Sequence, residues 1–131
     1  MIKLKNFVFN ELGVNSFVLY DPTSECIIVD PGCNTRQQQQ DLLDFIDENN
    51  LKPVLIINTH GHFDHVLGNG WLKSVYNCPL LMHRDDLNMI EHIDKYAGMF
   101  GYAVEKAPIP DQFLSDGQSI QFGESELKVI H

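Results

Sequence analysis

From residue 53 to residue 65 the chain reads Pro53-Val-Leu-Ile-Ile-Asn58-Thr-His60-Gly-His62-Phe-Asp64-His65. Four consecutive apolar residues are followed by three histidines and one aspartate within six positions. The apolar run contains three β-branched residues, which predicts a strand buried on both faces, as in a layered α/β protein. Nitrogen and oxygen donors gathered at the end of such a strand are typical of a divalent metal centre.

The spacing of these donors predicts how they share metal ions. Residues two apart in an extended segment project to the same side, so His60 and His62 can reach one metal. If the chain turns into a helix there, Asp64 and His65 can face a second metal close by. Gly61 leaves the loop free to take unusual dihedral angles. Such a donor set suits zinc, and also iron or manganese. A purely structural role, such as capping the next helix, is the minor alternative.

The segments before this stretch predict strands and one helix. The helix is expected to begin at Thr35, with Gln38 as its capping-box partner, and to end at Asn49-Asn50. Turn-forming residues separate the strands. The predicted strands are residues 2–9, 14–20 and 26–30.

The segments after it alternate between helical and extended patterns. Residues 84–97 carry apolar side chains at helical spacing, and glycines and prolines in residues 98–112 predict a loop. The other expected elements are a helix at 69–76, a strand at 79–82, and a hairpin of strands 119–122 and 126–130. The order of elements predicts an α/β fold with the metal donors at the carboxyl edge of the sheet.

Composition narrows the classes of partner. The 131 residues form one domain or part of one, and the net charge of −9 repels phosphate backbones and anionic lipid. We therefore expect neither nucleic-acid nor membrane binding, and no segment is apolar enough to cross a bilayer. The odd number of cysteines predicts no disulfide framework, with Cys26 buried and Cys33 exposed in a turn. A cytoplasmic location fits these features best.

Two motifs resemble the metallo-β-lactamase superfamily of metal-dependent hydrolases. The segment His60 to His65 is similar to the family's His-x-His-x-Asp-His signature, and Ile28 to Gly32 is similar to its first motif. Looser matches are Val14 to Phe17 and Leu127 to His131. The aromatic Phe63 and the glycine that follows the motif resemble the glyoxalase II-like members. The final His65 disfavours one subclass of true β-lactamases, and Phe63 disfavours the RNA-processing members.

The resemblance implies a fold and a set of roles. The fold would be the N-terminal half of a four-layer αββα sandwich, with a mixed sheet and flanking helices. His60 and His62 would bind the first of two zinc ions, and Asp64 and His65 the second. Asp30 would orient the ligand loop without binding metal. Asp64 would also be catalytic, because it would orient the metal-bound hydroxide that attacks a thioester or similar acyl substrate.

The family places further ligands beyond the point that corresponds to His131. The chain is therefore expected to be truncated before its metal site is complete, to bind metal poorly, and to be inactive by itself. Surface exposed in this way predicts a possible homo-oligomer. His131 is not assigned to the metal, since by resemblance it lies four positions before the next ligand. His83 is expected to have a turn or capping role, and His92 to lie on the polar side of a helix.

Two other functions stay open. One keeps the fold and the metal site but replaces hydrolysis with iron-dependent redox chemistry on a small molecule. The other is a non-catalytic module that folds and binds a partner. The sequence alone does not identify the metal or the substrate.

Overall fold

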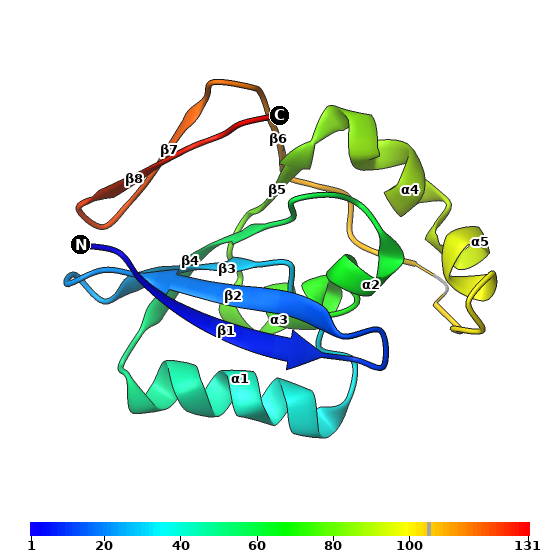
Figure 1. Cartoon of the computed structure of the whole chain (residues 1–131), viewed down its shortest axis with the longest axis horizontal. Helices are drawn as coiled ribbons and strands as arrows, with labels where there is room; N and C mark the ends of the chain where they lie inside the picture. The colour runs from blue at the N-terminus through cyan, green and yellow to red at the C-terminus, as the bar shows by residue number, and fades with distance from the viewer. Residues whose placement is uncertain (105) are drawn as a thin grey trace.

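A six-stranded mixed sheet forms the centre of the computed structural model, which describes residues 1–104 and 106–131 (Figure 1). The sheet contains β1 (Lys3–Phe9), β2 (Val14–Tyr20), β3 (Glu25–Val29), β4 (Lys52–Ile57), β5 (Leu80–His83) and β6 (Gln112–Leu114). A separate hairpin consists of β7 (Ser119–Phe122) and β8 (Ser125–Lys128). The helices are α1 (Arg36–Glu48), α2 (Phe63–Val66), α3 (Asn69–Tyr76), the 3-10 turn η1 (Arg84–Asp86), α4 (Leu87–Glu91) and α5 (Ile93–Gly98).

The strands of the central sheet follow chain order, from β1 at one edge to β6 at the other. The pairs β1–β2 and β2–β3 are antiparallel, whereas β3–β4, β4–β5 and β5–β6 are parallel. Every parallel connection passes through helical segments, as parallel pairs require. The carboxyl ends of β3, β4 and β5 therefore meet at one edge of the sheet.

Apolar side chains cover both faces of this sheet. On one face, Leu42 and Ile46 of α1 and Leu72 of α3 pack against the strands. On the other face, Ile120 and Phe122 of the hairpin pack against the strands, so the hairpin forms a further layer (Figure 1). The predicted mixed sheet with flanking helices is confirmed. No helix in the described ranges is both long enough and apolar enough to span a membrane.

Most predicted elements are present within one or two residues, and the differences are local. The predicted helical segment 84–97 consists of η1, α4 and α5, because the chain leaves helical geometry at His92 (φ −115°, ψ 31°). The short strand β6 was not predicted, since three residues next to a loop carry too little pattern. The predicted loop 98–112 is otherwise present, and its residue 105 lies outside the described residues.

Two predictions about burial were wrong. Cys33 is fully buried rather than exposed, and burial raises the pKa of its thiol to about 12, which argues against a nucleophilic role. Strand β4 is not buried on both faces along its length, since Val54 and Leu55 are only half-buried. The pairing of β3 with β4 shifts register there, because Pro53 and Leu55 pair with consecutive residues of β3 and leave Val54 as an extra residue.

Candidate metal centre

The candidate site forms where β3 and β4 end side by side. Asp30 directly follows β3, and the loop from Asn58 to His62 follows β4 and leads into α2. The backbone N–H of Asp30 donates to the carbonyl of Ile57 at 2.9 Å, which ties the two strand ends together. Asp30 has a positive φ of 51°, a conformation that aspartate tolerates better than most side chains. This backbone conformation is part of what places the Asp30 carboxylate beneath the loop.

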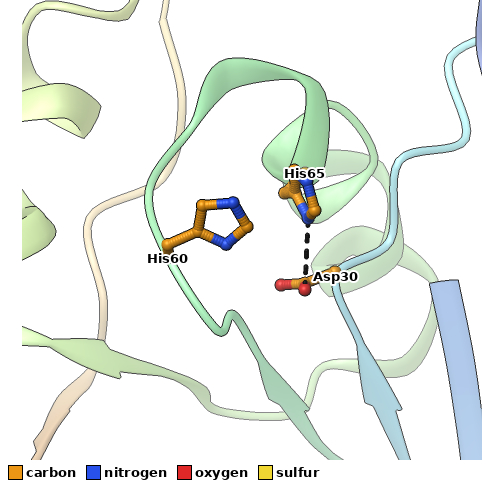
Figure 2. Close-up of side chains that lie close together, drawn as sticks. All are labelled: Asp30, His60 and His65. Carbon is orange, nitrogen blue, oxygen red and sulfur yellow. Dashed lines mark ion pairs between the residues drawn. The ribbon is translucent and has the colours of Figure 1, made fainter. Parts of the chain in front are cut away.

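The carboxylate of Asp30 holds the ligand loop by several contacts. Its Oδ1 accepts the backbone N–H of Thr59 at 2.8 Å, and its Oδ2 accepts the Thr59 hydroxyl at 2.5 Å. The same Oδ2 lies 3.2 Å from Nδ1 of His65, as the dashed line in Figure 2 shows. Asp30 is 3% exposed, so water does not compete for these contacts. The structure therefore places Asp30 in contact with Thr59 and His65, and the orienting role that the family resemblance implied for it stays a prediction.

A hydrogen bond at His60 and a close contact at His65 assign the proton positions of these two histidines. The Thr59 hydroxyl donates its only proton to Asp30, so it accepts from Nδ1–H of His60, which lies at 2.8 Å. The proton on His65 is placed on Nδ1 by its contact with Asp30. Both rings consequently keep the lone pair of Nε2 free, which is the form of imidazole that binds metal.

The structure brings His60 and His65 together with Asp30, whereas the ring of His62 lies 6.5 Å from that of His65 and neither His62 nor Asp64 belongs to that group. The ring of His60 lies 4.4 Å from that of His62 and 4.0 Å from that of His65, measured between centroids. The Asp64 carboxylate lies 3.8 Å from Nε2 of His65, on the side of the ring that faces away from Asp30. Ligand atoms of Asp30, His60 and His65 also fall within 4.8 Å of one another (Figure 2). The donor chemistry and spacing fit a metal, although metal binding itself stays a prediction.

Two buried asparagines support the loop, and neither was predicted from the sequence. Asn58 is 1% exposed, and its Nδ2 donates to the backbone carbonyl of His65 at 3.0 Å. Asn69 is fully buried and donates to Oδ1 of Asn58 at 2.8 Å. The only signal in the sequence was the polar Asn58 at the end of an apolar strand. Together these bonds fix α2 and the start of α3 against the end of β4.

Gly61 has a different role from the one predicted. Its φ is not positive, so the loop does not use the conformational freedom of glycine there. A Cβ atom at Gly61 would instead lie 2.9 Å from the backbone oxygen of Asp86 and 3.0 Å from its Cβ. Glycine is needed because the ligand loop passes directly against the start of α4.

The pKa values of His60 and His65 shift in opposite directions. Burial lowers the pKa of His60, and the nearby His65 and His62 lower it further. Burial also opposes charging of His65, but the hydrogen bond to Asp30 and the negative charges of Asp30 and Asp64 outweigh it and raise the pKa of His65. Because a metal ligand must be deprotonated, protons compete with a metal more strongly at His65 than at His60.

A second group of possible ligands lies outside the predicted site. His83, Asp85 and His131 bring ligand atoms within 4.8 Å of one another, and the rings of His83 and His131 stack with centroids 3.5 Å apart. Nδ1 of His83, however, accepts the backbone N–H of Asp85 at 3.1 Å, which is the capping role predicted for His83. The exposed His92 lies at the break between α4 and α5.

Comparison with known proteins identifies the family. The fold and the donor set define an α/β protein with a loop of candidate metal donors at the carboxyl edge of its sheet. A family model described as the metallo-beta-lactamase superfamily matches residues 9–131. The chain therefore belongs to the metallo-β-lactamase superfamily, as the motifs predicted.

Individual relatives agree with this family. An uncharacterised protein of Aquifex aeolicus is 35% identical over 122 residues, covering 92% of this chain and 54% of the relative. A hydroxyacylglutathione hydrolase of Bdellovibrio bacteriovorus is 28% identical over 110 residues, covering 84% of this chain and 35% of that protein. The chain thus spans about half or less of the length of these two curated relatives.

Two solved structures show the same fold. The crystal structure of the B3 metallo-beta-lactamase BLEG-1 superposes with a TM-score of 0.84 at 24% identity, covering 98% of this chain and 61% of that one. The di-iron-bound form of TTHA1623 superposes with a TM-score of 0.77 at 28% identity, covering 88% of this chain and 56% of that one. The solved structures that share this fold therefore include one in a di-iron-bound form.

Proposed function

We propose that the whole protein is a metal-dependent hydrolase of thioesters or similar acyl compounds, with His60, His62, Asp64 and His65 as metal ligands from this chain. The observation that supports the proposal is the meeting of His60 and His65 on a loop anchored by Asp30, with His62 and Asp64 each beside one of these two rings. Such anchoring of metal-binding histidines by carboxylates is common in metalloenzymes. The hydroxyacylglutathione hydrolase among the relatives supports the acyl substrate.

The chemistry requires an activated water and a polarised carbonyl. When bound, the metal ions supply both functions, since they lower the pKa of water and act as Lewis acids. In the hydrolysis of a thioester, the water oxygen forms a bond to the carbonyl carbon, the carbon–sulfur bond breaks, and a proton ends on the thiol. We assign Asp64 as the catalytic residue because its half-buried carboxylate can accept a hydrogen bond from that water.

The residues around the ligands keep their geometry. Asp30 holds the ring of His65 and, through the Thr59 hydroxyl, the ring of His60. We also propose that Asp30 remains a positioning residue rather than a ligand, because both of its oxygens already accept hydrogen bonds from Thr59. Two zinc ions fit the donors, and iron or manganese would fit as well.

Iron-dependent redox chemistry is a second candidate, favoured by the structural similarity to the di-iron form of TTHA1623. Metal analysis of the whole protein as isolated separates the two candidates. Zinc together with thioester hydrolysis supports the hydrolase, whereas iron together with oxygen- or thiol-dependent turnover supports the redox enzyme.

The proposed ligand set is tested by zinc titration in competition with a coloured chelator. We expect the single variants His60→Ala and His65→Ala to lower zinc affinity at least about tenfold, because each removes one of few ligands. His92→Ala is the matched control, since the exposed His92 belongs to neither group of possible ligands, and its affinity should equal that of the wild type. Hydrolysis by the whole protein should disappear with a chelator and return with zinc. Equal affinities in all variants, or hydrolysis that is insensitive to the chelator, would contradict the proposal.

A further inference from the structure

An apolar pocket of about 450 Å³ opens directly beside the candidate metal ligands. The side chains of His62 and Asp64 form one part of its wall. The rest of the wall consists of Leu12, Phe63, Met89, Tyr96 and Phe100. These residues come from the β1–β2 turn, from α2, and from the α4–α5 region, so three separate segments converge on the pocket. Its volume lies in the range of pockets that hold small organic ligands.

Apolar side chains at the edge of this pocket are unusually open to solvent. Phe100 is 64% exposed and Leu12 is 45% exposed. Phe100 is nevertheless held in place, since its ring lies 5.3 Å from that of the buried Phe63. Covering such surface with an apolar group is favourable in proportion to the area removed from water. The pocket is therefore suited to bind a hydrocarbon or aromatic group.

The charge on the pocket wall disfavours negatively charged ligand groups. Asp64 is the only charged side chain among its described lining residues, and none of them is Lys or Arg. A carboxylate or phosphate placed there would meet the negative charge of Asp64 without a cation to neutralise it. An uncharged group meets no such penalty.

We propose that this pocket binds an alkyl or aryl acyl group of the substrate, so that medium-chain and arylacyl thioesters are preferred to short hydroxyacyl ones. This inference rests on the proposed hydrolase function. It commits to the substrate as the occupant, because a protein segment lodged permanently in the pocket would cover His62 and Asp64. A short hydroxyacyl group would leave most of the apolar wall in contact with water.

Methionine methyl groups provide a direct probe that needs no turnover. Met89 lines the pocket, whereas Met82 is fully buried in the core and Met99 is 73% exposed outside the lining. We would titrate n-octanoate, whose alkyl chain can enter the pocket while its carboxylate stays in water at the opening, and separately lactate, into the metal-free 131-residue chain carrying ¹³C-methyl methionine. Saturable movement of the Met89 signal with octanoate but not with lactate is expected, while the Met82 signal stays in place.

Two variants complete the test. Phe100→Ala should weaken octanoate binding about tenfold, because it removes one aromatic wall. The matched control is Met99→Ala, an exposed neighbour outside the lining, which should bind octanoate like the wild type. An unmoved Met89 signal, equal weakening in both variants, or Met89 shifts that depend on protein concentration without octanoate would overturn the inference. The last outcome would mean that a second copy of the chain fills the pocket.

Substrate preference in the whole protein gives an independent readout. Acetyl, octanoyl and phenylacetyl thioesters of one thiol should differ in kcat/KM in favour of the larger acyl groups, and Phe100→Ala should reduce that preference. Zinc affinity should be the same in Phe100→Ala and the wild type. Normal zinc binding without an acyl-size preference would overturn only this inference, whereas octanoate binding without zinc binding would overturn only the proposed metal function.

Discussion

At the scale of residues, the carboxylate of Asp30 contacts two residues of the ligand loop and α2 at once, Thr59 and His65. Its two oxygens accept the N–H and the hydroxyl of Thr59 and contact Nδ1 of His65. Two imidazole rings therefore depend on one buried carboxylate, directly or through a hydroxyl. A side chain in this position controls metal affinity without needing to touch the metal.

Asp30→Asn should lower zinc affinity by about 10- to 100-fold, the usual effect of removing a carboxylate that orients a metal-binding histidine. The asparagine amide would place its N–H groups either at the Oδ2 position, where they face the Thr59 hydroxyl and Nδ1–H of His65, or at the Oδ1 position, where they face the N–H of Thr59. In either orientation at least one contact would be lost. Competition with a coloured chelator measures the affinity, and circular dichroism checks the fold. Zinc affinity within twofold of the wild type would show that Asp30 does not orient the ligands.

Gly68 illustrates how a single small residue keeps the elements of the site together. A Cβ at this position would lie 2.6 Å from the backbone oxygen of Pro31 and 2.7 Å from Sγ of Cys33. The N–H of Gly68 donates to the same Pro31 oxygen at 2.7 Å. The start of α3 therefore packs directly on the segment that follows Asp30.

At the scale of elements, the β7–β8 hairpin is attached to the sheet through Asp21. The Oδ2 atom of Asp21 accepts the N–H of Glu124 at 2.8 Å and the hydroxyl of Ser125 at 2.7 Å. Its Oδ1 accepts both the N–H and the hydroxyl of Thr23, at 2.9 and 2.5 Å. The Thr23 hydroxyl bond above all, together with the bonds from Ser125 and Glu124, lowers the pKa of Asp21 from 3.8 to about 2, although burial opposes the shift.

A carboxyl whose pKa is lowered on folding stabilises the fold above its ordinary pKa, and the contribution disappears as the pH falls toward the folded value. Asp21→Asn should therefore lower the urea midpoint at pH 5 to 7, and the difference from the wild type should shrink between pH 4 and pH 2. Urea unfolding followed by fluorescence at several pH values measures it.

Glu25→Gln is the control for this prediction, since Glu25 accepts only the N–H of Gly123, and glutamine keeps an acceptor oxygen. At neutral pH, Glu25→Gln should lower the urea midpoint less than Asp21→Asn does. A difference between Asp21→Asn and the wild type that stays constant down to pH 2 would contradict the assignment.

At the scale of the whole molecule, the face of the sheet under the hairpin is covered unevenly. Leu4 and Val8 of the edge strand β1 are 58% and 66% exposed. Leu4 pairs with the half-buried Leu19, which belongs to the apolar cluster beneath the hairpin. The uncovered apolar surface thus continues directly into a core, and such surfaces favour association.

We expect the 131-residue chain to self-associate, with an average mass that rises with concentration in sedimentation velocity. The double variant Leu4→Lys and Val8→Lys should shift the chain toward the monomer, because charged side chains on an edge strand oppose pairing and stay hydrated. Arg36→Lys, on the far side of the sheet in α1, is the control and should associate like the wild type. A wild type that is monomeric at every concentration tested would contradict this prediction.

The sequence by itself determined the features that depend on neighbouring residues. The apolar strand before the ligand loop, the types and spacing of the donors, and the family followed from the segment Pro53 to His65. Strand and helix positions followed from periodicity and turn residues, as with α3, whose predicted and observed bounds agree. These properties are encoded in short windows, where side-chain type and backbone preference act directly.

Only the tertiary structure decided which distant residues meet. It showed that Asp30 touches both Thr59 and His65, that Cys33 is buried, and that Gly61 is small because Asp86 lies against it. It also brought Leu12 and Phe100 to one pocket from segments far apart in the chain. Such contacts depend on the order and register of the strands, which bring residues of unrelated sequence position together once the sheet has formed. No local pattern records them.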